Sequence, residues 1–428
     1  MSTTTVTASA GDADIALGSP EERKRRLRLG FVLLAAGLIA LILALTTAPG
    51  SITFRLATGQ QPWLPEISLP AKPLALVLAA YTVAVAVTQL LKGLRGALGA
   101  MLFTLFGVGF IVAFVCWAAV GEEYPLTTQL QETINVSAPL IFGALAGVLC
   151  ERAGVINIAI EGQFLAGAFA AAILASVTQN QVAGLVGAMA AGMFIALLLA
   201  VFSIRYLVNQ VVLGVVLVVF ATGITGFLFD ALVETDPTHY NAPGVLAKVP
   251  IPGLEHFPVL GPVLFDQTVL VYLMYLAVAL VTFVLFRTTW GLRVRAVGEH
   301  PRAADTVGIR VLRTRYQAVL LGGLVAGLGG AFFTIGSTGG FSKEMTASKG
   351  FIALAAVIMG RWHPLGATLA ALFFGFTSQL QSGLGVIETP IPSELLRMLP
   401  YLLALVAVAG LIGRVRPPKA DGEPYTKE

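Results

Sequence analysis

Charged side chains are scarce in this chain of 428 residues. Asp, Glu, Lys and Arg together make up 12% of the sequence, whereas hydrophobic residues make up 57%. Soluble globular domains carry about 25% charged residues, so this chain could not cover the surface of a soluble protein of its size. The formal net charge of +4 does not indicate nucleic acid, because the basic residues are dispersed over short segments between apolar runs. The composition therefore excludes a soluble enzyme, a disordered chain and a nucleic-acid-binding protein, and it predicts an integral membrane protein.

The residues that usually build reactive or metal sites are also few. Cys116 and Cys150 lie in apolar stretches without a pairing pattern, and the four histidines are dispersed, which argues against a disulfide framework or a metal site. No nucleophile and base pair stands out. A Gly-x-x-x-x-Gly-Lys phosphate loop is missing, since the dipeptide Gly-Lys does not occur. We therefore expect no catalytic residue, metal or cofactor on this chain, and any ATP hydrolysis that drives it, with its ATP and Mg²⁺, must reside on a partner chain.

Long apolar runs fill most of the sequence. A helix that crosses about 30 Å of hydrocarbon needs about 20 apolar residues. The candidate segments are Phe31–Ala48, Leu74–Leu91, Ala97–Val120, Val136–Cys150, Ile160–Val177, Val182–Ile204, Val208–Phe229, Thr268–Phe286, Gln317–Ile335, Phe351–Met359, Leu365–Gln379 and Leu395–Leu411. The segment at Phe351 is too short to cross unless it is tilted, broken or one arm of a re-entrant pair. We predict an all-α integral membrane protein, a polytopic bundle of about 10–12 transmembrane or re-entrant helices.

Lys and Arg in the short loops set the predicted orientation, since cytoplasmic loops carry an excess of both. If the spans alternate, the basic groups fall on one side: residues 23–28, Lys92 with Arg95, Arg205, the loop 287–315, and Arg414 with Arg416. The opposite side carries Glu122, Glu123 and the acidic, proline-rich segment 231–267. We therefore predict that both termini are cytoplasmic. The predicted divisions are a tail at 1–29, extra N-terminal spans at 30–121, a transmembrane core at 122–413 and a second tail at 414–428.

The densest polar interruption lies at residues 151–163, Glu-Arg-Ala-Gly-Val-Ile-Asn-Ile-Ala-Ile-Glu-Gly-Gln. An ionisable side chain at the bilayer centre costs about 2.5–3.5 kcal/mol on insertion scales, so it needs a reason. Asn157 and Glu161 are four residues apart and would share one face of a helix. For Glu151 and Arg152, a cytoplasmic turn in contact with water explains the charges as well as a functional role does. For Asn157, Glu161 and Gln163 we favour polar lining of an internal cavity.

A second interruption has a similar arrangement late in the chain. Lys349 and Gly350 open a short apolar run, Arg361-Trp362-His363-Pro364 interrupts it, and a run rich in Gly and Ala resumes at Leu365. Interrupted hydrophobic segments in matching positions of two halves indicate a transport pathway. We therefore add Lys349, Arg361 and Trp362 to the predicted pathway, with a structural role for Arg361 and Trp362 left equally open.

The loop 287–315 carries seven Arg against Glu299 and Asp305. Pro301 suits the first turn of a helix, and Gly308 suits its C-terminal cap. Ala303, Ala304 and Val307 would then form a small apolar face on a short basic helix. Such a helix could lie on lipid headgroups, but a flat face of two alanines is better suited to close docking in a groove on another protein.

Three of these segments, in this order, resemble signature blocks of one protein family. Residues 151–162 resemble the signature of permease subunits in the branched-chain amino acid, simple sugar and nucleoside group of bacterial ABC importers. Residues 295–304, Arg-Ala-Val-Gly-Glu-His-Pro-Arg-Ala-Ala, followed by Gly308, are similar to the cytoplasmic coupling segment of that family, with its Ala-Ala-x-x-x-Gly core. Residues 350–364 are similar to a block typical of the nucleoside and simple-sugar branch. Residues 1–121 exceed what the shorter family members need.

The resemblance implies a transport subunit of the bacterial inner membrane rather than an enzyme, one that moves its cargo by alternating access. It implies an ABC ATP-binding subunit, a second homologous permease and an extracytoplasmic substrate-binding lipoprotein as partners, beside the membrane lipid. It implies nucleosides as cargo, with monosaccharides such as ribose as the alternative. By the resemblance, coupling to the ATPase falls to Arg293, Arg295, Gly298, Glu299, Pro301, Arg302, Ala303, Ala304 and Gly308.

Two other classes of function stay open at this stage. A secondary transporter driven by an ion gradient would need no ATPase, but it would show more carboxylates in mid-span, where Glu161 is nearly alone. An integral enzyme or a scaffold without transport would require a catalytic constellation, which the sequence does not show. Co-purification of an ATP-binding chain would favour the importer over both.

Overall fold

The computed structural model describes residues 20–59, 61–94, 96–386, 394–395, 398 and 416–426. Within these residues nine helices are long and apolar enough to cross a membrane, which confirms the all-α polytopic class. They are α2 (Pro20–Thr46), α3 (Ala71–Leu91), α4 (Gly96–Ala118), α5 (Leu126–Glu151), α6 (Ile160–Thr178), α7 (Gln181–Ala200), α8 (Gln210–Leu228), α10 (Val269–Arg287) and α13 (Val311–Phe333). Short π-helical turns extend α7, α8 and α13, namely η1 (Val201–Arg205), η2 (Phe229–Val233) and η5 (Thr334–Thr338). Four predicted features lie outside the described residues: the tail at 1–19, Arg95, Arg414, and the span at 395–411 apart from Leu395 and Met398.

The short apolar segment near the C-terminal end of the chain is helix α14 (Lys349–Met359), and it is followed by α15 (Pro364–Val386). With 11 residues and a rise of about 1.5 Å per residue, α14 is about 16 Å long, half the thickness of the hydrocarbon core. It therefore cannot cross the membrane alone. It packs against α5, α6 and α15 inside the bundle.

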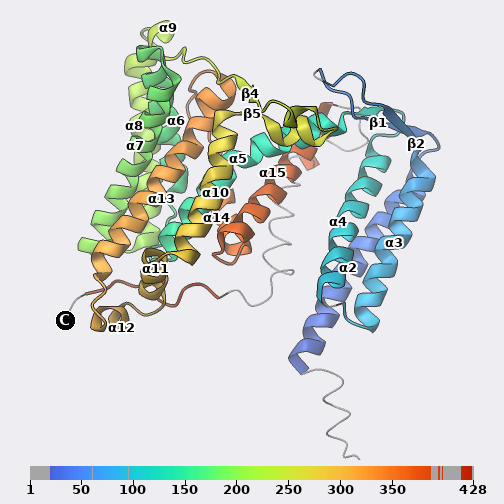
Figure 1. Cartoon of the computed structure of the whole chain (residues 1–428), viewed down its shortest axis with the longest axis horizontal. Coiled ribbons are helices and arrows are strands. Elements are labelled where there is room, and N and C mark those ends of the chain that lie inside the picture. Colours follow the sequence, from blue (N-terminus) through green and yellow to red (C-terminus); the bar gives the residue numbers. More distant parts are fainter. Residues whose placement is uncertain are drawn as a thin grey trace, which may run out of the picture.

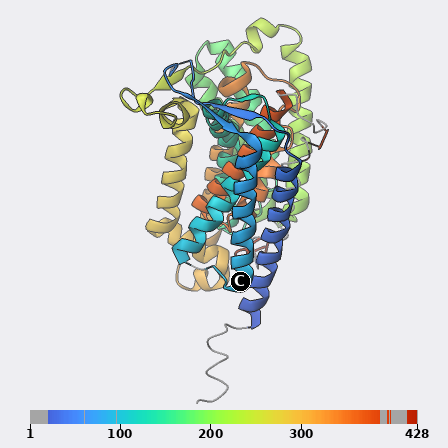
Figure 2. The same cartoon turned by 90° about the vertical axis from the view of Figure 1, so that its right-hand side faces the viewer.

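The elements outside the spans gather at the two ends of the bundle (Figure 1). One end, which we name the α12 end, carries α11 (Thr289–Glu299), α12 (Pro301–Thr306) and the C-terminal segment 416–426. The first turns of α2 lie at this end too, as the second view confirms (Figure 2). The other end, which we name the sheet end, carries the described strands and the short helix α9 (Pro237–Tyr240).

The strands at the sheet end form two small sheets. β1 (Ser51–Arg55) pairs with β2 (Glu66–Pro70) antiparallel and with β3 (Glu123–Tyr124) parallel, in the order β2-β1-β3. β4 (Lys248–Pro250) and β5 (Asp266–Thr268) pair antiparallel. The second sheet closes the long loop between α8 and α10, so this loop is an ordered part of the sheet end.

Helix α5 is the centre of the molecule. Every residue from 137 to 151 is buried, and the helix packs against α6, α10, α13, α14 and α15. Small residues allow neighbouring backbones to approach closely: a methyl group on Gly327 of α13 would come within 2.1 Å of the Ala188 carbonyl oxygen of α7. Close contact of this kind is the main source of helix association in lipid, where burial of apolar surface gives little.

Helices α2, α3 and α4 pack on one another at the periphery and reach the rest of the chain mainly through α15, the start of α5 and the first sheet. Of the most apolar stretch of each, 28–33% is buried inside the chain, against 83% for α5. Many of their exposed side chains are large and apolar, among them Phe31, Val77 and Leu98, as a surface in contact with lipid requires.

Candidate functional site

The first polar interruption is a true break in the helical structure. Helix α5 ends at Glu151, residues 152–159 are not helical, and α6 starts at Ile160. Gly154 has a φ of +82°, a conformation that other residues rarely adopt. Asn157 therefore lies in the break, and the expectation that it shares a helix face with Glu161 is wrong. The helical spacing was sound, but the backbone leaves the helix before Asn157.

The break folds back into the bundle. Ile160 lies against Gly143 and Gly147 of α5, within 3.1–3.4 Å of where their side chains would begin. These glycines precede the end of α5 by four and eight residues, which is about 6–12 Å along a helix. The start of α6 thus lies deeper in the bundle than the end of α5, and this break connects the α12 end with the interior.

Two amide side chains brace the break. Asn157 donates to Gln163 Oε1 at 3.2 Å, and Gln163 donates back to Asn157 Oδ1 at 3.3 Å. Both side chains are fully buried, and Asn157 also approaches Cys150 Sγ at 3.5 Å. These contacts hold the break against α5 and the first turn of α6; their lining of a cargo cavity stays a prediction.

Glu161 joins the break to the second interruption. Its Oε1 accepts hydrogen bonds from the Thr346 hydroxyl (2.6 Å) and the Ser348 N–H (2.9 Å), and its Oε2 accepts one from the Gly350 N–H (2.6 Å). The carboxylate thereby satisfies free N–H groups at the start of α14, where a negative charge is also favoured by the helix dipole. Lys349 is half-buried beside it, with its ammonium 5.8 Å from the centre of the Phe333 ring.

The far end of α14 is tied to the other end of the break. The indole N–H of Trp362 donates to Glu151 Oε2, and Arg152 Nε donates to the Trp362 carbonyl oxygen at 2.7 Å. Trp362 and the exposed Arg361 have φ angles of +53° and +56°, rare for residues other than glycine. Glu151 and Arg152 therefore hold a packed joint, and both ends of α14 are fastened to the first break.

Part of the predicted coupling loop rests on this joint. A methyl group on Gly298 of α11 would come within 2.2 Å of the Arg152 carbonyl oxygen, so the two backbones touch. The guanidinium groups of Arg152 and Arg295 lie 5.9 and 4.9 Å from the centre of the Phe286 ring. Burial lowers the pKa of Arg152, and the nearby Glu299 carboxylate opposes this shift. Arg295, Gly298 and Glu299 are thus brought together at the break, whereas Arg293 is exposed on α11.

Helix α12 has the predicted start and end. Pro301 lies in its first turn, and Gly308 follows its last with a φ of +84°. The Gly308 N–H donates to Asp305 O (2.9 Å) and the Ile309 N–H to Ala304 O (3.0 Å), the paired bonds of a Schellman cap. The physical logic of the sequence motif is therefore confirmed.

The expected apolar face of α12 needs a correction. Ala304 is only 4% exposed and packs against Val297, Val311 and Tyr425 of this chain. Ala303 is exposed, as are Arg302 and, at 75%, Val307. The two alanines point in different directions because adjacent residues of a helix are about 100° apart. The surface that α12 offers to a partner therefore includes Ala303 and Val307 but not Ala304.

A C-terminal segment also belongs to this site, and sequence reasoning assigned it only to a tail. Ala420 N–H donates to the Gly298 carbonyl oxygen at 2.9 Å, and Arg315 Nη1 donates to the Glu423 carbonyl oxygen at 2.9 Å. Arg315 is 1% exposed. The available signal was an arginine two residues before the predicted span 317–335, together with acidic residues in the C-terminal tail; the structure places Arg315 inside α13.

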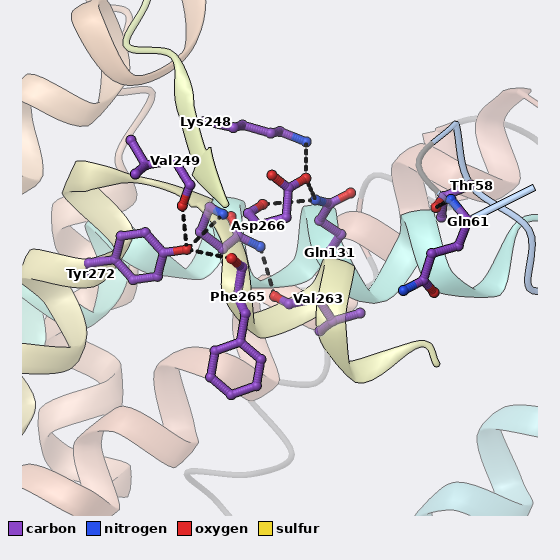
Figure 3. Close-up of polar contacts among 10 residues, drawn as sticks. Thr58, Gln61, Gln131, Lys248, Val249, Val263, Phe265, Asp266 and Tyr272 are labelled. Carbon is purple, nitrogen blue, oxygen red and sulfur yellow. Dashed lines mark hydrogen bonds and ion pairs between the residues drawn. The ribbon is translucent and has the colours of Figure 1, made fainter. Parts of the chain in front are cut away.

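Polar contacts anchor the long loop at the sheet end (Figure 3). Gln131 of α5 donates to the Asp266 carbonyl oxygen at 3.1 Å, and the hydroxyl of Tyr272 lies 2.7 Å from the Phe265 carbonyl oxygen. The Gln61 amide donates to the Glu255 carbonyl oxygen at 2.8 Å. These contacts fasten the loop to α5, to α10 and to the segment between β1 and β2. In the described part of the chain, no group of three or more His, Cys, Asp or Glu could hold a metal ion.

Comparisons with known proteins place the chain in a family. The family model described as "Branched-chain amino acid transport system / permease component" matches residues 129–408. The guanosine ABC transporter permease protein NupQ of Bacillus subtilis (strain 168) is 41% identical over 312 residues, which cover 71% of this chain and 97% of that protein. The nucleoside ABC transporter permease protein NupC of Lactococcus lactis subsp. cremoris (strain MG1363) is 38% identical over 304 residues, covering 68% and 94%.

A third relative is the putative glucose ABC transporter permease protein TsgC13 of Haloferax volcanii, 36% identical over 254 residues, covering 59% of this chain and 76% of that protein. No solved structure matches the chain. The family match covers more than half of the chain, and the first two relatives are matched over nearly their whole length. The chain is therefore a multi-pass membrane transport component and belongs to the family of branched-chain amino acid transport system permease components, as the three sequence blocks indicate.

Proposed function

We propose that this chain is the membrane-spanning permease subunit of an ATP-driven importer for nucleosides. The observation that carries the proposal is the contact of Gly298 with Arg152, because it joins α11, which leads directly into the exposed helix α12, to a break that reaches the interior of the bundle. The nucleoside cargo is supported by relatives whose names state guanosine and nucleosides. ATP hydrolysis, with its ATP and Mg²⁺, resides on an ATP-binding partner subunit.

The α12 end is the cytoplasmic end in this proposal, with both termini on the same side. It carries the seven arginines of the loop 287–315, in keeping with the excess of positive charge in cytoplasmic loops. The sheet end then faces outward, where the ordered loop between α8 and α10 offers a docking surface for a substrate-binding lipoprotein. A second permease of the same family completes the pathway.

The mechanism is alternating access, driven from α12. Movement of the ATPase displaces the exposed surface of α12, and α11 passes the displacement to the break through Gly298 and Arg152. The break moves α14 from both ends, through the Glu161 cap and through Trp362. Because α14 spans only half the membrane, a shift of this helix opens or closes the interior without moving a full span.

Reconstitution tests the proposal. The permease is assembled in proteoliposomes with its ATP-binding subunit, the second permease and the binding lipoprotein, and uptake of radiolabelled guanosine is measured with ATP on the cytoplasmic face. We expect uptake that requires ATP and stops with a non-hydrolysable analogue. Uptake that proceeds without ATP under an ion gradient would instead establish a secondary transporter.

A second candidate cargo is a monosaccharide, which the 36% identity to a putative glucose permease favours. The same vesicles decide between the two cargoes. If the importer carries nucleosides, excess unlabelled ribose or glucose should leave the uptake of radiolabelled guanosine unchanged. If it carries a sugar, the vesicles should import radiolabelled ribose or glucose and not guanosine.

A further inference from the structure

The C-terminal segment 416–426 lies in the angle between three elements of the α12 end. It meets α11 through the hydrogen bond from Ala420 N–H to the Gly298 carbonyl oxygen. It meets α13 through the bond from Arg315 Nη1 to the Glu423 carbonyl oxygen. Ala420 is 1% exposed, so this contact is part of the packed interior.

The segment also completes the hydrophobic support of α12. Tyr425 is 7% exposed and shares one apolar cluster with Val297, Ala304 and Val311, which come from α11, α12 and α13. A helix of six residues is too short to be stable by itself. The orientation of α12 therefore depends on this cluster, to which the C-terminal segment contributes its aromatic ring.

The same segment touches the first break directly. A methyl group on Gly154 would come within 2.8 Å of the Ala420 carbonyl oxygen, and one on Gly422 within 2.7 Å of Ile156 Cδ1. Gly154 and Gly422 have φ angles of +82° and +78°, so both backbones use conformations that suit glycine at this contact.

A buried arginine strengthens the junction. Arg315 is 1% exposed, and the hydrogen bond to the Glu423 carbonyl oxygen is the one that its guanidinium makes within the described residues, where its Nε and Nη2 atoms have no partner. A buried charge that loses its hydrogen-bond partner is costly, so detachment of the segment would disturb the start of α13.

We propose that residues 416–426 form a coupling strap, which binds α12, the start of α13 and the first break into one unit so that displacement of α12 reaches the break. Tyr425 is a positioning residue of this strap. The inference rests on the proposed function. In this proposal the segment stays docked while it passes the displacement of α12 to the first break, and it does not have to detach from the bundle during transport.

The first test removes the strap. A permease that ends at Arg416 is assembled with the ATPase, the second permease and the binding lipoprotein, and guanosine imported per ATP hydrolysed is measured. We expect the complex to hydrolyse ATP while this ratio falls about 5–150-fold, the usual range for coupling between two sites. A wild-type ratio in the truncated permease would contradict the proposed role of the strap. Faster uptake would contradict it too, because it would show that the segment inhibits transport.

A milder variant covers the case in which the truncated chain does not assemble. Tyr425→Ala should lower the ratio without lowering ATP hydrolysis, and Lys419→Ala, at an exposed position of the same segment, is the matched control. A wild-type ratio for Tyr425→Ala would contradict the proposal. A merely structural role would change yield and thermal stability but leave the ratio of the assembled complex intact.

A cross-link separates transmission from release. Cysteines placed at Val297 and Tyr425, which share one cluster, are joined by a short bridging reagent. Before bridging, the double variant should have a lowered ratio, as Tyr425→Ala has. A docked strap transmits, so bridging should raise the ratio; a further loss of transport on bridging and its recovery on cleavage would overturn the inference. The wild-type complex is the reference. If it imports no guanosine with ATP, the proposed function is wrong, and the proposed role of the strap is wrong with it. If the wild-type complex and every variant import guanosine normally, only the proposed role of the strap is wrong.

Discussion

The indole N–H of Trp362 donates a hydrogen bond to the carboxylate of Glu151, although 211 residues separate them in the chain. Glu151 ends α5, and Trp362 follows α14, so this bond joins the two polar interruptions of the sequence. Glu151 is 3% exposed, and its other oxygen has no hydrogen-bond partner within the described residues. The carboxylate therefore depends on the indole.

Trp362→Phe should destabilise the protein more than an ordinary tryptophan replacement. The variant leaves the buried carboxylate of Glu151 without its hydrogen-bond donor, which should lower the free energy of unfolding by about 1–3 kcal/mol. Thermal unfolding in detergent measures it, with Trp290→Phe, whose indole donates to Gln317 at 3.1 Å in a half-buried position, as the matched control. Glu151→Gln in the Trp362→Phe background should recover part of the loss, because it removes the buried charge. Equal midpoints for the two tryptophan variants would contradict the dependence.

Glu161→Gln should weaken the start of α14. An amide oxygen still accepts from Thr346 or Ser348, but the amide nitrogen cannot accept from the Gly350 N–H, and hydrogen bonds to charged groups contribute about 1.5–3 kcal/mol. We expect a lower unfolding midpoint and lower guanosine uptake. Glu344→Gln, an exposed position of the preceding loop, should change neither. A wild-type midpoint for Glu161→Gln would show that the cap is dispensable.

Ala303→Glu and Ala304→Glu should separate docking from folding. Ala303 is exposed, so its replacement should change the free energy of unfolding by less than about 0.5 kcal/mol yet reduce co-purification of the ATPase. Ala304 is buried against this chain, so its replacement should lower the unfolding midpoint first. Co-purification assays and thermal unfolding of the two variants side by side check this. Full ATPase binding by the Ala303 variant would remove α12 from the docking surface.

Gly298→Ala should strain the contact between α11 and the break. The added methyl group would meet the Arg152 carbonyl oxygen, and overpacking of this kind costs about 1–3 kcal/mol. Gly223→Ala is the matched control, since nothing lies within 4 Å of an added methyl group there, and loss of a glycine inside a helix stabilises by about 0.5–1 kcal/mol. The two variants should therefore shift the unfolding midpoint in opposite directions.

Docking of the C-terminal segment should depend on pH. Burial raises the pKa of Asp421 from 3.8 to about 7 in the docked segment, while Arg315 acts in the opposite direction. The docked segment thus binds the proton of Asp421 more tightly than the detached segment does. The docked state is therefore most stable at a pH below the pKa that Asp421 has in the detached segment. Its stability declines as the pH rises through the raised pKa of Asp421 in the docked segment.

We therefore expect a larger docked fraction at pH 6 than at pH 8. Spin labels on cysteines at Lys419 and Arg293, both exposed, report this fraction as a distance distribution by pulsed electron resonance. Asp421→Asn should abolish the dependence. An unchanged distribution in the unmodified segment would show that Asp421 is already ionised when docked.

Much of the fold follows from patterns that act over short distances. The long apolar runs predict the described spans because a bilayer requires about 20 apolar residues per helix. Pro301 and Gly308 predict the limits of α12 because each suits one helix end by its own backbone preference. The outcome at Asn157 shows where such patterns stop: its helical spacing from Glu161 is real, but the backbone turns at Gly154 before that spacing can apply.

The sequence by itself determined that this chain is a helical membrane protein, where most of its spans lie, and which three segments carry its family resemblance. Only the tertiary structure decided that Glu161 caps α14, that Ala304 is buried, and that Arg315 bonds to the C-terminal segment. The reason is physical. Span length and helix ends depend on residues that are neighbours in the sequence. The partner of a buried charge comes from a segment that is distant in the sequence, and the spacing of nearby residues does not identify that segment.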